Sequence, residues 1–393
     1  MFAKIKRDSV LCRKFVSCLL AVCVLLSFVL AFPVRASALS AEEISAPSAI
    51  LIEPKSRKVL FEKNSHEIRA CASITKVMTL VLVFEAMDEG KISYDDVVTT
   101  SAHASSMGGS DIWLEVGETM SVHDMIKAVV VASANDAAVA LAEHICGSEE
   151  EFVSKMNEKA KSLGMNDTTF KNCNGLDEEG HLTSAYDVAL MSAELIKHED
   201  IFEFSSIWLD YLRGGETQIV NTNKLLKSYK GITGLKTGTT SQAGSCMSAT
   251  AERDGLSLVA VVLGCSTGTS RFSDSAKLLD YGFANYKTEK LPLPEGCLTP
   301  IKVKKGMLSE VPLTCEISDS LLLPKGSSDN IKTEYVLSEE LEATVEKGTV
   351  VGKLTYLYSG STVDEYNIVT SESISPMTFT SVYKLLWQKL CSL

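Results

Sequence analysis

The chain has 393 residues, of which 45% are hydrophobic and 22% charged, and its formal net charge at pH 7 is −12. This length allows two domains, or one large domain with an appendage, and the composition is that of a globular protein. The acidic excess argues against nucleic-acid binding, because neutralising phosphates requires clustered Lys and Arg. We therefore expect no nucleic-acid partner.

The first 38 residues have the three parts of a secretory signal peptide. Five basic residues precede an apolar run over 15–32, and Ala36-Ser37-Ala38 is a cleavage site of the small-x-small type. Cleavage there leaves 32 basic and 49 acidic residues, a net charge of −17. We expect an exported protein; an uncleaved membrane anchor is the alternative, because the apolar run is near the lower limit for spanning a bilayer.

The spacing of cysteine and histidine argues against a metal site. The sequence contains no Cys-x-x-Cys, His-x-x-x-His or His-Glu-x-x-His pattern, so we expect no metal and no other cofactor. The mature chain keeps eight dispersed cysteines, and their even number does not specify a pairing. Disulfides and free thiols both remain open.

In chain order, the predicted elements begin with two strands, 48–53 and 59–63, joined in a hairpin. Capped or apolar periodic segments then predict helices at 73–88, 121–132, 136–145, 184–197 and 271–285. Alternating apolar runs predict strands at 233–239, 245–252 and 256–264. Strands at both ends with helices between predict an α/β fold of the α+β type, in which the first and last strands close a sheet and a helical lobe is attached.

The composition changes after about residue 289. Short β-branched runs separated by glycine turns predict a separate all-β domain over 289–373. Over 374–393, apolar residues fall at helical spacing with lysines on the other side, which predicts an amphipathic helix on the outer face of the cytoplasmic membrane. Docking of this helix on the protein's own surface is the alternative. With a signal peptide at 1–38, this leaves 39–288 as the first mature domain.

Ser73-Ile74-Thr75-Lys76 places a hydroxyl and an amine on one face of a helix that begins here. An outward backbone N–H at a helix start suits an oxyanion. Lysine acts as a base only when desolvation or a neighbouring cation lowers its pKa, and the apolar surroundings and Lys236 offer both. An isolated Ser-x-x-Lys is more often a helix cap with a surface lysine, but here two companion motifs follow.

The first companion motif is Ser133-Ala134-Asn135, which lies between two predicted helices. At such a break, side chains can project into a cleft instead of bonding to their own helix. Ser133 could pass a proton to a leaving amine, and Asn135 could hold Lys76 and a substrate amide. The alternative is that Asn135 only caps the next helix.

The second companion motif is Lys236-Thr237-Gly238, on a predicted strand. Gly238 leaves room for a substrate beside the backbone, and Lys236, Thr237 and Thr239 could receive a carboxylate. A lone Lys-Thr-Gly is usually a turn. Together, in this order, the three motifs favour acyl transfer through a covalent serine ester.

These residues and their surroundings resemble the low-molecular-mass penicillin-binding proteins, the serine-type D-alanyl-D-alanine carboxypeptidases. The resemblance covers nearly the whole mature chain and is carried by the three motifs and further segments, among them 72–79, 133–138, 181–187, Asn221-Thr222-Asn223 and 234–244. It implies a β-lactamase/transpeptidase-like domain, with an antiparallel sheet flanked by helices, that removes the terminal D-alanine from peptidoglycan stem pentapeptides and is inhibited by β-lactam antibiotics.

The resemblance also implies residue roles. Ser73 is the nucleophile and Lys76 the base, and Ser133, Asn135 and Lys236 complete the site. The backbone N–H groups of Ser73 and Thr239 form the oxyanion hole. Arg271 binds the substrate carboxylate, with an ion pair to Asp274 as the alternative.

Two positions depart from the family pattern. Cys71 replaces a common proline, which suggests local sensitivity to thiol reagents, and Asn174 stands where some relatives carry histidine. Neither change removes a catalytic group.

Three other classes of protein could share parts of this motif pattern. A class A β-lactamase needs a glutamate to activate water, and no Glu-x-x-Leu-Asn segment lies between Asn135 and Lys236. A D,D-endopeptidase would differ in the peptide that the cleft accepts, which motifs do not report. A non-enzymatic cell-wall binding module predicts the loss of a catalytic residue, and all are present.

Overall fold

The computed structural model describes residues 39–290, 293–317, 321–326, 331–358 and 360–391. The expected signal peptide lies outside these residues. No helix in the described ranges is both long enough and apolar enough to cross a membrane.

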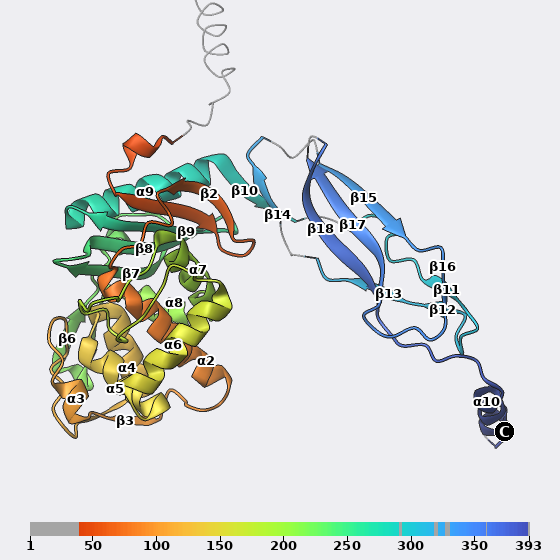
Figure 1. Cartoon of the computed structure of the whole chain (residues 1–393), viewed down its shortest axis with the longest axis horizontal. Helices are drawn as coiled ribbons and strands as arrows, with labels where there is room; N and C mark the ends of the chain where they lie inside the picture. Colours follow the sequence, from red (N-terminus) through yellow and green to blue (C-terminus); the bar gives the residue numbers. More distant parts are fainter. Residues whose placement is uncertain (1–38, 291–292, 318–320, 327–330, 359, 392–393) are drawn as a thin grey trace, which may run out of the picture. The chain divides into compact units, whose positions relative to one another are not determined.

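A five-stranded antiparallel sheet organises the first region of the chain (Figure 1). Its order is β2 (Lys58–Lys63), β1 (Ser48–Glu53), β9 (Leu256–Cys265), β8 (Gly244–Arg253) and β7 (Ile232–Thr240). The first strand pairs with a strand more than 200 residues later, with Ile50 opposite Val261. The expected closure of the sheet by its first and last strands is therefore confirmed.

Alternate residues of β1 face two different cores, as the pleat of a strand requires. Ile50 and Ile52 pack in a core shared with the helical lobe, whereas Ala49 and Leu51 pack in a second core. The helix α9 (Gly268–Asn285) covers this second face through residues such as Leu278. Both faces of the sheet are buried, so β1 is apolar along most of its length.

The helical lobe consists mainly of α2 (Lys76–Asp88), α4 (Val122–Lys127), α5 (Asn135–Cys146), α6 (Glu149–Leu163) and α7 (Ala185–Leu195). Shorter elements complete it: α3 (Ala102–Ser105), α8 (Ile201–Ser205) and the hairpins β3–β4 (Val97–Thr99, Thr119–Ser121) and β5–β6 (Leu209–Leu212, Thr217–Val220). The sequence analysis did not predict α6.

Two predicted helices are broken at positions of the sequence motifs. The helix expected from residue 73 starts as a 3₁₀ turn, η2 (Ala72–Thr75), and becomes α-helical only at Lys76. The helix expected over 121–132 is α4 followed by a π-helical turn, η3 (Ala128–Ala132), which ends at Ser133. Irregular turns of this kind re-aim side chains and are frequent at functional sites.

The C-terminal region is rich in β-structure, as expected. β13 (Leu313–Cys315), β18 (Ser361–Thr370), β17 (Val350–Tyr358) and β15 (Ile331–Leu337) form one sheet, and β12 (Glu310–Val311), β11 (Ile301–Lys304) and β16 (Glu340–Glu342) form another. β10 (Tyr286–Glu289) pairs with β14 (Leu321–Pro324). The last described element is the helix α10 (Phe379–Cys391), at the position predicted for the tail helix.

Candidate active site

Ser73 lies in the η2 turn, one helical turn from Lys76, the first residue of α2. The Lys76 Nζ is 3.1 Å from the Ser73 Oγ. Ala72, immediately before Ser73, has a φ of 52°, which lies in the left-handed region that non-glycine residues rarely adopt. This conformation sets the tight turn that presents Ser73 beside the amine.

The Lys76 ammonium is completely buried, and it donates hydrogen bonds to the Asn135 Oδ1 (2.5 Å) and to the Asn174 carbonyl (2.6 Å). Burial lowers the pKa of Lys76 to about 7, because desolvation disfavours the charged form. Both partners are fixed acceptors. When the amine is neutral, its two N–H bonds point to them and its lone pair is left facing the Ser73 hydroxyl.

Ser133 and Asn135 occupy the break between η3 and α5. Ser133 has a φ of 61°, which ends the π-helical turn, and Asn135 is the first residue of α5. The Asn135 side chain binds Lys76 through its oxygen and donates through Nδ2 to the Gly108 carbonyl (2.6 Å). Asn135 is therefore a bridge between Lys76 and the loop at Gly108, and it is not a simple helix cap.

Lys236 lies on β7, opposite this break, and is 2% exposed. Its Nζ donates to the Ser133 Oγ (2.8 Å) and to the Thr237 carbonyl (2.9 Å). Burial lowers the pKa of Lys236 well below its usual value, and the positive charges of Lys76 and Arg271 lower it further. The Lys-Thr-Gly segment is a strand, so its alternative interpretation as a turn is wrong.

Gly238 brings β7 close to the turn that carries Ser73. A Cβ at this position would lie 2.7 Å from the Cys71 carbonyl oxygen and 3.0 Å from the Ser73 backbone nitrogen. Any side chain would push the strand away from Ser73. The absence of a side chain thus allows the two halves of the site to meet.

Arg271, on α9, reaches over the end of β7. Its Nη1 donates to the Gly238 carbonyl (2.9 Å) and to the Thr239 Oγ1 (2.8 Å). The alternative ion pair with Asp274 is wrong, because the Asp274 carboxylate instead accepts hydrogen bonds from the Ser45 hydroxyl and the Ala46 backbone. The Thr237 hydroxyl donates to the Thr222 hydroxyl (2.7 Å).

The structure adds a group to which the sequence analysis assigned no role. The Lys171 N–H donates to the His181 Nδ1 (3.0 Å), so the proton of the neutral ring is on Nε2, which donates to the Thr75 Oγ1 (2.7 Å). Thr75 in turn donates to the Ala72 carbonyl (2.9 Å). Burial lowers the pKa of His181 to about 4, which keeps the ring neutral. This directed chain of hydrogen bonds braces the turn that carries Ser73.

Cys71 is also part of this turn, and its thiol is buried. Burial raises the pKa of Cys71 to about 11, so very little thiolate forms at neutral pH. The structure therefore does not support the expected sensitivity of this position to thiol reagents. The eight cysteines of the described residues are all free thiols.

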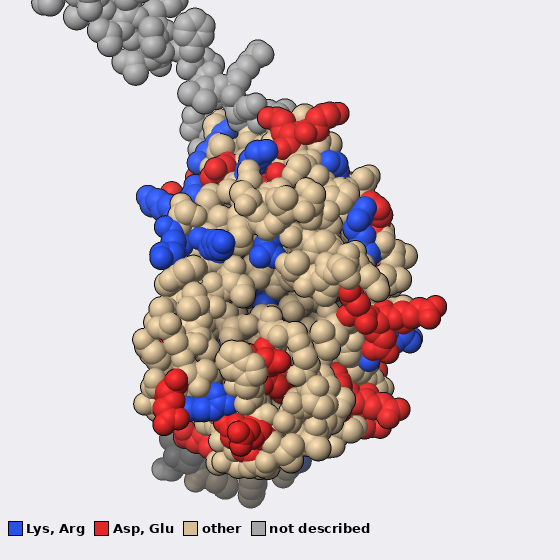
Figure 2. Space-filling model, turned by 90° about the vertical axis from the view of Figure 1, so that its left-hand side faces the viewer, with Lys and Arg blue, Asp and Glu red and all other residues tan. Residues whose placement is uncertain are grey.

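The face of the molecule in Figure 2 is hollowed near its centre. Blue Lys or Arg atoms are visible at the bottom of the hollow, and uncharged atoms form most of its walls (Figure 2). Positive groups in a hollow with mostly uncharged walls suit a ligand that brings its own negative charge.

Comparison with known families agrees with this geometry. Residues 35–267 match the model of the peptidase S11 family, D-alanyl-D-alanine carboxypeptidase, and residues 288–375 match the C-terminal domain of penicillin-binding protein 5. The chain belongs to the D-alanyl-D-alanine carboxypeptidase family, the low-molecular-mass penicillin-binding proteins. The family predicted from the sequence motifs is thereby confirmed.

Individual relatives carry the same assignment over most of their length. The chain is 45% identical to the D-alanyl-D-alanine carboxypeptidase DacF of Bacillus subtilis, covering 86% of this chain and 88% of the relative. It is 35% identical to DacC of Escherichia coli, covering 85% of each. Penicillin-binding protein 5 of Haemophilus influenzae has a similar solved structure, with a TM-score of 0.77, 31% identity and coverage of 86% of this chain and 100% of that one.

Proposed function

We propose that this chain removes the terminal D-alanine from peptidoglycan stem pentapeptides through an acyl-enzyme on Ser73. The observation that carries the proposal is the 3.1 Å contact between the Ser73 Oγ and a buried amine held by two fixed acceptors. A lysine whose pKa is about 7 is partly neutral at physiological pH, as a general base must be.

In the first step, the Ser73 oxygen attacks the carbonyl carbon between the two D-alanines while Lys76 accepts the hydroxyl proton. The negative charge that develops on the carbonyl oxygen is received by the backbone N–H groups of Ser73 and Thr239. When the C–N bond breaks, the leaving amine takes a proton from Ser133, whose hydroxyl is held by Lys236 at 2.8 Å. Proton return from Lys76 restores the Ser133 hydroxyl.

In the second step, water attacks the ester on Ser73, and Lys76 again accepts the proton. The C–O bond to Ser73 breaks, the shortened peptide leaves as a carboxylic acid, and the Ser73 hydroxyl is regenerated. Before the C–N bond breaks, the carboxylate of the terminal D-alanine lies near Thr237, Gly238 and Thr239, where Lys236 and Arg271 supply positive charge.

Two measurements test this proposal. Mass spectrometry of intact protein with labelled penicillin should show one covalent adduct in the wild type and none in Ser73→Ala. Release of D-alanine from a synthetic pentapeptide should be lost in the same variant. Labelling that survives Ser73→Ala contradicts the nucleophile assignment, and cleavage of cross-linked dimers without release of D-alanine indicates an endopeptidase.

We also propose that the protein is exported and that α10 holds it at the outer face of the cytoplasmic membrane. Phe379, Tyr383 and Trp387 stack along one side of α10, and Phe379 is 88% exposed. The segment from 374 to 393 has no acidic residue. An exposed aromatic stripe on a helix that also carries the exposed Lys384 suits an interface between lipid and water.

Deletion of the residues after Ser375 tests the role of α10. The truncated mature protein should appear in the soluble fraction after cell lysis, whereas the full-length mature protein should pellet with membranes. Equal membrane association of the two proteins would contradict the proposal. The replacement of Phe379 and Trp387 by serine is a milder version that keeps the chain length.

A further inference from the structure

A loop beside the active site displays an exposed tryptophan in an unusual backbone conformation. Trp113 is 76% exposed, and its φ of 56° lies in the left-handed region. A bulky residue rarely adopts this conformation, and water does not favour an exposed indole. Contacts from other residues must therefore stabilise this backbone conformation, which leaves the indole ring exposed to solvent.

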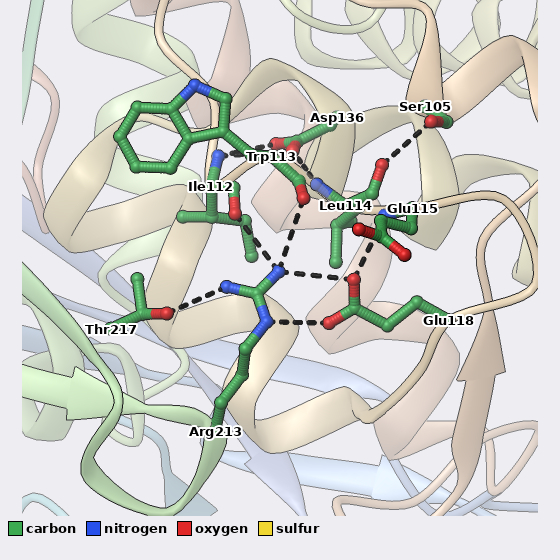
Figure 3. Close-up of polar contacts among 9 residues, drawn as sticks. All are labelled: Ser105, Ile112, Trp113, Leu114, Glu115, Glu118, Asp136, Arg213 and Thr217. Carbon is green, nitrogen blue, oxygen red and sulfur yellow. Dashed lines mark hydrogen bonds and ion pairs between the residues drawn. The ribbon is translucent and has the colours of Figure 1, made fainter.

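Two charged side chains hold the backbone on either side of Trp113 (Figure 3). The buried Asp136 carboxylate accepts hydrogen bonds from the backbone N–H groups of Ile112 (3.1 Å) and Leu114 (3.0 Å). Arg213 donates to the carbonyl oxygens of Ile112 (3.0 Å) and Trp113 (3.5 Å). Arg213 is itself fixed by Glu118 (2.7 Å). The backbone is thus fixed, while the indole ring takes no part in the network.

The same loop rests on the residues of the active site. The Asn135 Nδ2 donates to the Gly108 carbonyl, and the Asn135 backbone N–H donates to the Ser110 carbonyl, both at 2.6 Å. Asp136, which anchors the loop on its other side, is the next residue along α5. Trp113 is therefore rigidly linked to the amide that holds Lys76. The backbone at Trp113 is thus tied to the start of α5, which carries Asn135.

The carboxylates near Trp113 are not all neutralised, because Arg213, which contacts the backbone of this loop, is paired with Glu118. Asp111 lies two residues before it and Glu115 two residues after it, and no basic residue occurs between Ser106 and Glu118. Asp111 is partly exposed, and it has no hydrogen bond or ion pair among the residues that the structure describes. Partial burial and repulsion by Asp136 raise the pKa of Asp111. A cation bound here would relieve this repulsion.

We propose that Trp113 and Asp111 form a subsite that receives an ammonium-bearing side chain of the acyl-donor peptide. The ring face offers a cation–π contact and the aliphatic stem of the side chain packs on it, while the Asp111 carboxylate neutralises the charge. This inference rests on the proposed function, because the peptide that enters the subsite is the carboxypeptidase substrate. It adds a specificity determinant outside the three motifs.

The test compares two peptides that differ only in this charge. Acetyl-L-Lys-D-Ala-D-Ala has a free Nε amine, and its Nε-acetylated counterpart has none. We expect the wild type to prefer the free amine about tenfold in kcat/KM, the order of a partly desolvated cation–π contact. In Trp113→Ala and Asp111→Asn, this preference should fall to within about twofold, and Trp113→Phe should retain part of it.

Tyr335→Ala, which removes an exposed aromatic ring from β15, is the matched control and should keep the full preference. Labelling with penicillin counts the folded active sites in every sample. Equal kcat/KM for the two peptides in the wild type, or an unchanged preference in Trp113→Ala, overturns the subsite while the proposed function stands. Failure of the wild type to release D-alanine from either peptide overturns the proposed function as well.

Discussion

The two main regions of the chain treat polar side chains in opposite ways. Residues 39–288 bury many polar and charged side chains, and one group of them belongs to the candidate site: Thr75, Lys76, Asn135, Asp136, His181 and Lys236. Among the described residues after 288, buried side chains with a polar group are few, such as Thr370 and Tyr356, and the ion pairs lie on the surface, such as Lys353 with Glu365 (2.9 Å). Burying polar groups costs stability unless every group is bonded. Within the described part of the chain, only the region that carries the candidate site therefore bears this cost to a large extent.

The largest expected effect is that of Lys76→Met. Removing the proposed base should slow acylation by penicillin and release of D-alanine by about 10³-fold or more. At pH 7 the variant should nevertheless melt at a higher temperature than the wild type. The folded pKa of Lys76 is about 7 and the unfolded one about 10.4, so between these values protonation favours the unfolded wild-type chain.

Thermal melts at pH 7 and pH 10 separate the two parts of this prediction. The stability advantage of Lys76→Met should shrink at pH 10, where the unfolded lysine has begun to lose its proton as well. Lys76→Arg is the control that keeps a buried cation. If the Met variant is less stable at both pH values, the hydrogen bonds of Lys76 stabilise the folded wild type by more than the desolvation of its amine costs.

His181→Ala should have a smaller but clear effect. Without the ring, Thr75 loses the donor that fixes its hydroxyl, and the turn at Ala72 loses its brace. We expect kcat to fall by about 10–100-fold with little change in KM, because His181 positions Ser73 and does not bind the peptide. His181→Gln keeps one amide donor and should recover part of the rate. A change confined to KM would contradict a positioning role.

The pH dependence of the wild type offers a test without mutation. Lys76 must be neutral to accept a proton, so kcat/KM should fall about tenfold per pH unit below pH 7. Above pH 7, Lys76 is mostly neutral, and its protonation no longer lowers kcat/KM. Rates measured between pH 5 and 9 on the pentapeptide provide the profile. A flat acid limb would assign the base to another group.

In the C-terminal region, Leu354→Ala should reduce stability without affecting chemistry. Leu354 is fully buried in the core of that region, so truncation should cost about 2–5 kcal/mol. Chemical denaturation would measure this loss, and labelling by penicillin under native conditions should proceed at the wild-type rate. A slower reaction would connect this region to the active site.

The smallest expected effect is that of Lys353→Ala, which breaks the surface pair with Glu365. Exposed pairs of this kind contribute little, because water and salt screen them. We expect a melting temperature indistinguishable from that of the wild type at physiological salt. A clear destabilisation would show that the pair belongs to a larger network.

The sequence predicted the sheet, the order of the motifs and the pairing of Ser73 with Lys76, since these follow from periodicity and short spacing. It did not predict that Ser73 lies in a 3₁₀ turn or that η3 is π-helical. The turn at Ser73 is packed against a segment far along the chain: a Cβ on Gly175 would lie 2.0 Å from the Ala72 carbonyl oxygen. The sequence also did not predict the contacts of Arg213 with the Trp113 loop, because they join positions about 100 residues apart.

The pairing of β1 with β9 has a consequence for synthesis. A chain that ends before residue 256 has the serine and both lysines but cannot seat β1 inside the sheet, because its neighbour is absent. Such a fragment should be inert to antibiotics of the penicillin type. Sensitivity to the drug should therefore appear late and all at once as the polypeptide lengthens.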